Sequence, residues 1–419
     1  MSWRSFGCLV VCATLTVACS EDDGGEPQPR PLVDPGTGPW QPVAASEVAE
    51  VCGLDPVALE DANRVIAELG GAGYAVVRYG RLCHEHVVSG QDAPGEIYST
   101  TKTLGALVTG VAAYQTRDLP RTERKTGALS DLDRVDHWLD DFTFNPEARI
   151  AHVLGMVAHN TDLSPDVREF QYDVVGQVQI NRLSDVVSTA IAQDPARLGA
   201  NLEEFTQRFL FRPLGLEHST WSNGAPDKVY GLSWSSTRRD MARVGLLMLN
   251  GGVWSGQRVV AAEWIYKMTH PSFEDANTAY GYLTWLSARC NWVPIFPPKL
   301  EEAVDSCMPA ALWNDYPHEP SGAPDCRYGA VAGCEQRFDV GVWFAAGLNG
   351  QYIYGHPGLD MVVVIKDLNK GAIDARAPRR TFWAALRKAV VARDPTYAGD
   401  EAAFCEAYGS NRYAPDLRR

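Results

Sequence analysis

Residues 97–113 read IYSTTKTLGALVTGVAA, a short polar segment that runs into an almost wholly apolar stretch. Ser99 and Lys102 stand three residues apart, so on a helix that begins at Ser99 their side chains share one face, with Cβ atoms about 5–6 Å apart. The unpaired N–H groups and the positive potential of such a helix start favour an oxyanion. A serine hydroxyl is a weak nucleophile that needs a base beside it. A lysine serves as this base only when burial or a cationic neighbour lowers its pKa from about 10.4, and the apolar run predicts that burial.

The spacing alone also fits a structural interpretation, in which an N-cap serine is followed by a lysine that extends its amine to solvent. Four more segments, in a fixed order along the chain, decide between the two interpretations. They are Val153–Leu163, Glu203–Trp221, Ser236–Arg243 and Leu249–Gly252.

Together with Ile97–Lys102, these segments resemble the motifs of the serine β-lactamase, penicillin-binding protein and esterase superfamily, nearest its class C-like branch. The resemblance extends from about residue 50 to residue 390. It implies an α/β (α+β) fold of the β-lactamase/transpeptidase type, with a mixed, mainly antiparallel sheet flanked by helices and an inserted all-helical subdomain. It also implies that Ser99 is the nucleophile and that Lys102 is its base.

The second motif of the family, Y-x-N, has its best match at Tyr172-Asp173-Val174. The resemblance implies that Tyr172 is the phenol that moves protons between the nucleophile and the leaving group, with Lys102 helping to keep it ionisable. Val174 stands where the family has the amide, so this part of substrate recognition is missing. Asn181, further along the chain, would supply the amide of the motif only if the loop had a different register. The structural alternative for Tyr172 is an aromatic side chain that covers the core of the helical subdomain.

Residues 343–353, WFAAGLNGQYI, occupy the place of the third motif, K/H-T/S-G, and look most like the branch of 6-aminohexanoate-oligomer hydrolases and related esterases. The resemblance implies that the Leu348 N–H completes the oxyanion site opposite the Ser99 N–H, and that Ala346, Gly347 and Asn349 bind the substrate. No basic residue precedes Ala346. The cation that would hold the carboxylate of a β-lactam or a peptide is therefore missing, which argues against efficient penicillin hydrolysis.

The periodicity of the apolar residues predicts a sheet domain in two parts on either side of a helical block. The first part spans 46–115, the helical subdomain 116–229, and the second part 230–395, with a Cys/Pro-rich insertion at 287–337. The individual elements expected are helices at 47–69, 237–249, 262–268 and 378–392, and strands at 74–79, 82–88, 340–346, 351–355 and 361–366.

The chain begins with a segment that predicts export. Residues 1–18 have a positive start and an apolar run too short to span a bilayer, as in a signal peptide. Leu15–Cys19 resembles a bacterial lipobox, in which Cys19 is lipidated. An ordinary signal peptide cleaved nearby is the alternative. Residues 19–45, rich in acidic residues, Pro and Gly, are expected to form a flexible linker, and 396–419 a C-terminal tail.

The charge and the cysteine content limit which partners, disulfides and metal sites the chain can have. With 38 Lys+Arg against 52 Asp+Glu, the net charge of −14 and the lack of a dense Lys/Arg run argue against a nucleic-acid-binding role. Of ten cysteines, Cys290, Cys307, Cys326 and Cys334 favour disulfides in the insertion, with a zinc site as the alternative. Cys52, Cys83 and Cys405 leave one partner over, so their pairing stays open.

Two histidine patterns offer alternatives to the serine site. His84 and His86 share one strand face, a spacing that some metals use, but no third ligand follows them and an exposed strand edge explains them better. His356 and Asp360 would fit a catalytic triad, but they flank a Pro-Gly turn that explains them. No metal and no organic cofactor is implied.

The sequence therefore predicts an exported serine hydrolase that cleaves an ester or amide through a Ser-Lys-Tyr acyl-enzyme mechanism. We expect a small ester, amide or peptide-like substrate, no nucleic-acid partner, a monomer, and contact with a membrane only through a lipid at Cys19. The expected location is the bacterial cell envelope, on its periplasmic or extracellular face. The alternatives are a peptidoglycan D-Ala peptidase or β-lactamase, and an inactive binding module on the same fold.

Overall fold

A computed structural model of the chain describes a large part of its body. The described residues are 32–141, 145, 147–158, 170–221, 229–273, 276, 280–286, 343–368 and 376–390. They belong to one compact unit, Leu32–Arg419. The predicted signal peptide 1–18, Cys19, the insertion 287–337 and the tail 396–419 lie outside the described residues.

A six-stranded sheet, antiparallel between all neighbours, runs through this unit in the order β2-β1-β11-β10-β9-β8. Its strands are β1 (Gly73–Arg78), β2 (Arg81–Val87), β8 (Trp285–Leu286), β9 (Trp343–Gly347), β10 (Gln351–His356) and β11 (Met361–Lys366). Strands β1, β10 and β11 are buried along their whole length, which is why β11 reads MVVVIK without polar alternation. The predicted fold class is confirmed.

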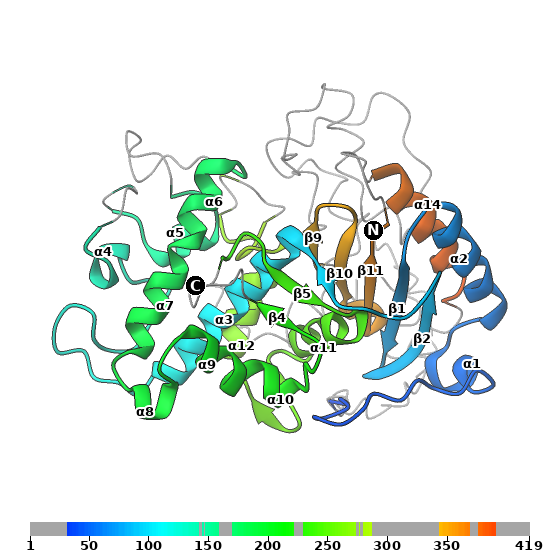
Figure 1. Cartoon of the computed structure of the whole chain (residues 1–419), viewed down its shortest axis with the longest axis horizontal. Helices are drawn as coiled ribbons and strands as arrows, with labels where there is room; N and C mark the ends of the chain where they lie inside the picture. Colours follow the sequence, from blue (N-terminus) through cyan, green and yellow to red (C-terminus); the bar gives the residue numbers. More distant parts are fainter. Residues whose placement is uncertain are drawn as a thin grey trace, which may run out of the picture. The chain divides into compact units, whose positions relative to one another are not determined.

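Helices cover both faces of this sheet (Figure 1). On one face, a Cβ on Gly245 of α11 would stand 2.6 Å from Val362 and 2.8 Å from Ile353, so glycine lets this helix approach β10 and β11 closely. On the other face, Tyr74 of β1 contacts Phe382 of α14, with 4.9 Å between ring centroids. The elements around the sheet are α1 (Val48–Cys52), α2 (Pro56–Glu68), α11 (Arg238–Leu249), α12 (Ala262–Thr269), α14 (Arg376–Arg387), the short strands β3 (Gly95–Glu96), β4 (Thr220–Trp221), β5 (Trp234–Ser236), β6 (Val253–Trp254) and β7 (Gln257–Arg258), and the turn η5 (Pro357–Leu359).

A block of helices lies between the two parts of the sheet in the sequence and packs around α3 (Thr101–Thr116), which is buried along most of its length (Figure 1). Gly105 and Gly110 leave room on α3 for the rings of Tyr230 and Trp264, which a Cβ at either position would overlap. The other members of the block are α4 (Val135–Trp138), α5 (Ile150–Leu154), α6 (Val174–Asn181), α7 (Leu183–Ile191), α8 (Pro195–Leu198), α9 (Leu202–Thr206), η2 (Gln207–Phe211) and α10 (Arg212–Leu214).

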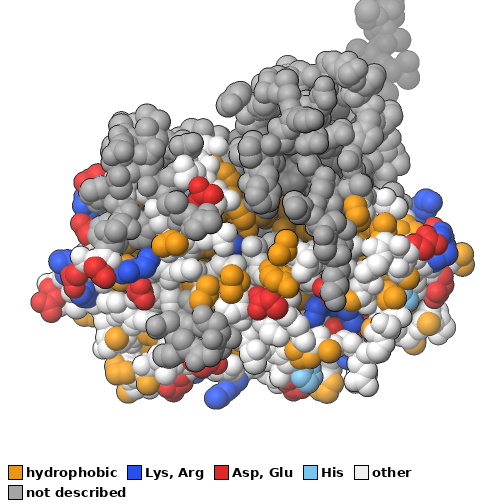
Figure 2. Space-filling view, turned by 45° about the horizontal axis from the view of Figure 1, so that its top comes forward, with side chains coloured by type: hydrophobic (Ala, Val, Ile, Leu, Met, Phe, Trp, Pro, Cys, Tyr) orange, Lys and Arg blue, Asp and Glu red, His pale blue; other side chains and the backbone are white. Residues whose placement is uncertain are grey.

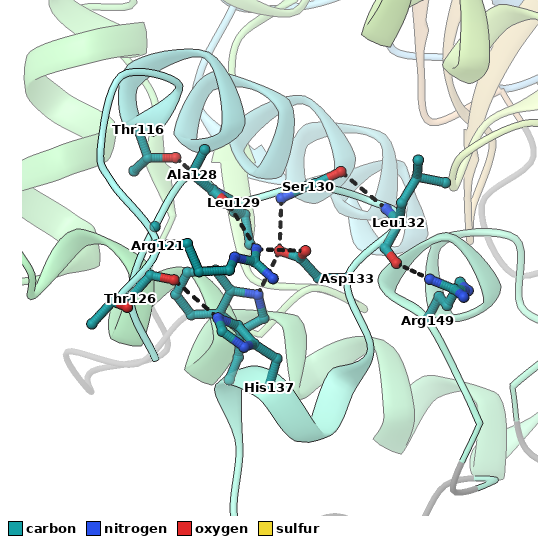
Figure 3. Close-up of polar contacts among 12 residues, drawn as sticks. Thr116, Arg121, Thr126, Ala128, Leu129, Ser130, Leu132, Asp133, His137 and Arg149 are labelled. Atoms are coloured by element: carbon teal, nitrogen blue, oxygen red, sulfur yellow. Dashed lines mark hydrogen bonds and ion pairs between the residues drawn. The ribbon is translucent and has the colours of Figure 1, made fainter. Parts of the chain in front are cut away.

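A buried carboxylate organises the first loop of this block (Figure 3). Asp133 accepts hydrogen bonds from the Ser130 N–H at 3.0 Å, from Trp138 Nε1 at 2.9 Å and from Arg121 Nη2 at 2.7 Å. These bonds satisfy the carboxylate where water is excluded. The loop between α3 and α4 therefore has a fixed shape although it contains no regular element.

The predicted linker 19–45 is wrong for its last part, because residues 32–43 pack on the body. Trp40 is buried, and the Val43 N–H donates to Leu82 O at 2.8 Å. Buried Arg243 of α11 donates to Gly36 O at 2.8 Å. The body holds this segment largely through hydrogen bonds to the backbone carbonyl groups of the segment. A composition rich in Pro and Gly does not indicate such bonds.

Two further findings concern the cysteines and membrane-spanning helices. Cys52 at the end of α1 forms a disulfide with Cys83 of β2, 31 residues away, which resolves two of the three cysteines whose pairing was open. None of the helices within the described ranges has the length and apolar character that crossing a membrane requires.

Candidate active site

Ser99 lies in the single 3₁₀ turn η1 (Tyr98–Thr100), which leads directly into α3. The residue before it, Tyr98, has a left-handed backbone with φ +48°, a conformation that costs energy in a residue other than glycine. Glu96 supports it, because Glu96 Oε1 accepts the Tyr98 N–H at 3.0 Å. The strained turn leaves Ser99 half-buried at the start of a buried helix.

Lys102 lies one turn further on and reaches back to the serine. Its Nζ is 2.8 Å from Ser99 Oγ and 3.2 Å from Gly231 O, and its side chain is 1% exposed. No Asp or Glu among the residues that the structure describes bonds to this amine. Lys102 is therefore a buried amine without a carboxylate partner among the described residues.

Tyr172 comes to the same place from the loop before α6. The Lys102 Nζ lies 4.8 Å from the centre of the Tyr172 ring. Tyr172 also packs against Trp285 at 5.3 Å between centroids, and Trp285 packs against Tyr280 at 4.8 Å. Burial, with a contribution from nearby Tyr172, raises the pKa of the Tyr280 hydroxyl well above its usual value, so Tyr280 stays protonated. The three residues expected to act together therefore lie together, with the ring of Tyr172 as the part that meets Lys102.

The threonines of the motif hold this turn in place. Thr100 Oγ1 donates to Gln351 O of β10 at 3.0 Å, and Thr103 Oγ1 donates to Leu283 O at 2.8 Å. Thr101 Oγ1 accepts the Trp234 N–H of β5 at 3.2 Å. Each bond ties the helix start to a different segment. The sequence alone gave these hydroxyls no role, because their partners are backbone groups distant in the chain.

The strand expected to supply the second oxyanion donor passes directly beside this turn. A Cβ on Gly347, the last residue of β9, would stand 2.2 Å from Ile97 O and 2.9 Å from Thr100 Oγ1. Ala346 and Gly347 are half-buried, and Leu348 follows at the start of the β9–β10 turn with its side chain exposed. Asn349 completes that turn in a left-handed conformation, with φ +63°. The structure therefore brings the end of β9 to the Ser99 turn.

Comparisons with known proteins bear on the fold that carries this geometry. No protein-family model matches the sequence, and no curated protein matches it. A β-lactamase/D-alanine carboxypeptidase from Pseudomonas syringae is 13% identical, with 80% of this chain and 98% of that chain covered at a TM-score of 0.49. A 6-aminohexanoate-dimer hydrolase homologue from Bacillus anthracis is 14% identical, with 76% and 79% covered at a TM-score of 0.46. A β-lactamase-like protein from Bacteroides dorei is 15% identical, with 81% of this chain and 98% of that chain covered at a TM-score of 0.51. The chain has the β-lactamase-like fold.

Within this β-lactamase-like fold, two residues that the sequence did not point to shape the site. Glu96 Oε1 accepts the Ser233 N–H at 2.8 Å as well as the Tyr98 N–H, so one carboxylate connects the serine turn to the loop at 229–233. Gly231 in that loop supplies the carbonyl that contacts Lys102. An acidic residue three positions before the motif serine was a visible signal for Glu96, whereas nothing local marks Gly231.

In the part of the chain that the structure describes, His84 and His356 have other partners. His84 Nε2 lies 2.8 Å from Asn63 Oδ1, and burial lowers the pKa of His84 to about 4. His356 Nδ1 accepts the Leu359 N–H, so it caps η5, as the turn explanation predicted. Within the described ranges, no three His, Cys, Asp or Glu side chains come together as metal ligands.

We expect Gly347→Ala to lower kcat by about 100-fold, because the added methyl overlaps the Ile97 carbonyl and must push the end of β9 away from the Ser99 turn. Ester turnover by the purified variant measures this effect. Gly38→Ala is the matched control, since its new methyl would meet no atom closer than 3.9 Å and Gly38 is remote from Ser99 in the sequence and on another segment. A Gly347→Ala variant with wild-type kcat would contradict the placement of β9 in the site.

Proposed function

We propose that this protein is a serine hydrolase that cleaves esters or amides through an acyl-enzyme on Ser99. The observation that carries the proposal is the 2.8 Å contact between Lys102 Nζ and Ser99 Oγ, made by an amine that is almost fully buried. Helix start, nucleophile and base then belong to one rigid segment of η1 and α3.

In this mechanism the Lys102 amine takes the Ser99 proton as Oγ attacks the substrate carbonyl. The N–H groups of Ser99 and Leu348 hold the oxyanion of the tetrahedral intermediate, where the positive end of α3 adds to the stabilisation. Tyr172, beside Lys102, passes the proton to the leaving group. Water then attacks the acyl-enzyme and releases the acid, and the proton returns to Ser99.

Support for an uncharged substrate comes from the residues around the serine. Ala345, which is not basic, precedes Ala346 and Gly347 in β9, so this segment offers no cation to a substrate carboxylate. Two exposed apolar side chains directly follow residues of the site in the chain: Leu232 follows Gly231, and Leu348 follows Gly347. Figure 2 shows hydrophobic side chains across the middle of the face that it presents. We therefore propose small, apolar esters or amides as the substrates.

We also propose that the protein acts as an exported monomer in the bacterial cell envelope, held on the periplasmic or extracellular face by a lipid on Cys19. The support is the lipobox-like sequence Leu15–Cys19.

Turnover of p-nitrophenyl butyrate, compared with covalent labelling by a fluorescent penicillin, tests the proposed substrate class. We expect ester turnover that Ser99→Ala removes, and penicillin acylation at least about 100-fold slower than ester acylation, because a charge-assisted contact to the carboxylate is missing. Rapid penicillin labelling at Ser99 would favour the D-Ala peptidase or β-lactamase alternative. Failure of both reagents would favour the inactive binding module.

A further inference from the structure

Gly231 connects Lys102 to the last residue of α6, beyond the Tyr172–Val174 segment that matches the second motif. Its carbonyl lies 3.2 Å from Lys102 Nζ, and its N–H donates to Asn181 Oδ1 at 3.1 Å. Asn181 is the last residue of α6, the helix that begins just after Tyr172. Lys102 and Asn181 thus meet opposite sides of one glycine.

The loop that carries Gly231 is held on both sides. Glu96 Oε1 accepts the Ser233 N–H at 2.8 Å on the side of the serine turn, and Asn181 holds Gly231 on the side of α6. A Cβ on Gly231 would stand 3.3 Å from Gln177 Oε1, 3.7 Å from Asn181 Oδ1 and 3.9 Å from Lys102 Nζ. The glycine therefore lets the amides of α6 and the buried amine approach one another closely.

A base must present its lone pair to the serine, and a neutral amine does so only when its hydrogens have fixed acceptors. Gly231 O is such an acceptor for Lys102, and the hydrogen bond from the Gly231 N–H to Asn181 fixes where that carbonyl stands. We propose that Asn181 is a positioning residue for Lys102, acting through Gly231. This inference rests on the proposed function, because it concerns the base of that reaction.

The proposal also explains how the site works without an amide at Val174. Asp173 accepts the Gly176 N–H at the start of α6, and Asn181 projects from its other end. The helix thus places the amide of Asn181, which lies eight residues after the Asp173 cap, beside the contact between Lys102 and Gly231.

The charged side chains around Lys102 are engaged elsewhere, so a carboxylate introduced nearby would act on the Lys102 amine. Among the described residues, the titratable and charged side chains on the surrounding segments are Glu96, Tyr98, Tyr172, Asp173, Arg182, Tyr230, Tyr280 and Tyr282. Glu96 binds backbone N–H groups, Asp173 caps α6, and Arg182 pairs with Asp141 and Asp185. No described Asp or Glu bonds to Lys102 Nζ, so an aspartate at position 181 would place a carboxylate across Gly231 from this amine.

Two variants of Asn181 test the proposal, with ester turnover and the pH–rate profile as readouts. Asn181→Leu removes the acceptor and is expected to lower kcat about 10- to 100-fold with little change in KM. Asn181→Asp keeps the acceptor and should retain kcat within about threefold at its optimum. It should also move the acidic limb of the profile about one unit to higher pH, because a nearby carboxylate favours the charged, non-basic form of the amine.

Asn63→Leu is the matched control, because Asn63 also ties segments together, accepting from Tyr74 Oη at 2.9 Å, but lies on α2. It should lower stability and leave the pH profile in place. Wild-type kcat in Asn181→Leu, or an unmoved profile in Asn181→Asp, would overturn the proposal.

A second readout separates this inference from the proposed function. With ε-¹³C-lysine, the eight lysines of the chain give few NMR signals, and Lys102→Met identifies that of Lys102. Asn181→Asp should raise the pH midpoint of this signal by about one unit even in a protein that hydrolyses nothing. A shifted midpoint without any turnover would overturn the proposed function alone, whereas an unshifted midpoint would overturn the role of Asn181.

Discussion

Ser99→Ala should remove ester hydrolysis, with kcat lower by about 10⁴- to 10⁶-fold, because the variant lacks the hydroxyl that we propose forms the acyl-enzyme. Its free energy of unfolding should change by less than about 1 kcal/mol, since Ser99 is half-buried and, among the described residues, its Oγ has one hydrogen-bond partner, Lys102. Stopped assays with p-nitrophenyl butyrate and thermal unfolding measure the two quantities.

Ser188→Ala is the control for this result, because Ser188 is a half-buried serine on α7 outside the site. It should keep wild-type turnover. If Ser99→Ala kept more than about a tenth of the wild-type kcat, Ser99 would not be the nucleophile, and the β-lactamase-like fold would carry another chemistry here.

Lys102→Met should lower kcat by about 10³-fold or more, because the variant lacks the group that takes the serine proton. Methionine has a similar length and fills the buried space with apolar atoms. The free energy of unfolding should therefore stay close to the wild-type value, or rise, since a buried amine to which no described Asp or Glu bonds is exchanged for an apolar side chain.

Lys267→Met serves as the control, because we expect it to lower stability and to leave kcat nearly unchanged. Lys267 Nζ lies 2.8 Å from Asp131, whose buried carboxylate also accepts the Tyr282 hydroxyl at 2.6 Å. Losing this lysine should cost about 1–3 kcal/mol of stability and leave kcat within about twofold. Equal losses of turnover in the two lysine variants would show that Lys102 matters for folding and not as a base.

The local patterns of the sequence predicted the local parts of this structure. The strands at 74–79 and 361–366 were visible because they form short apolar runs, and they become β1 and β11. The Ser99–Lys102 contact was visible because a helix fixes the geometry of residues three apart. Tyr172 required the family resemblance, since nothing in its own segment indicates its partner.

The parts that the sequence did not predict are contacts between backbone groups and distant side chains. Gly231 meets Lys102 through a carbonyl, a group that every residue carries, so no residue type marks it. The docking of residues 32–43 escaped prediction for the same reason. Its composition is that of a flexible linker, yet Gly36 O accepts a hydrogen bond from Arg243, which lies more than 200 residues away in the chain.

Mass-spectrometric mapping of the residue labelled by a fluorophosphonate tests the central claim most directly, namely that Lys102 makes the Ser99 hydroxyl nucleophilic. The account predicts one adduct, on Ser99, that forms rapidly in the wild type and about 10³-fold more slowly in Lys102→Met. A wild type that stays unlabelled, an adduct on another residue, or equal labelling rates in the two proteins would contradict it.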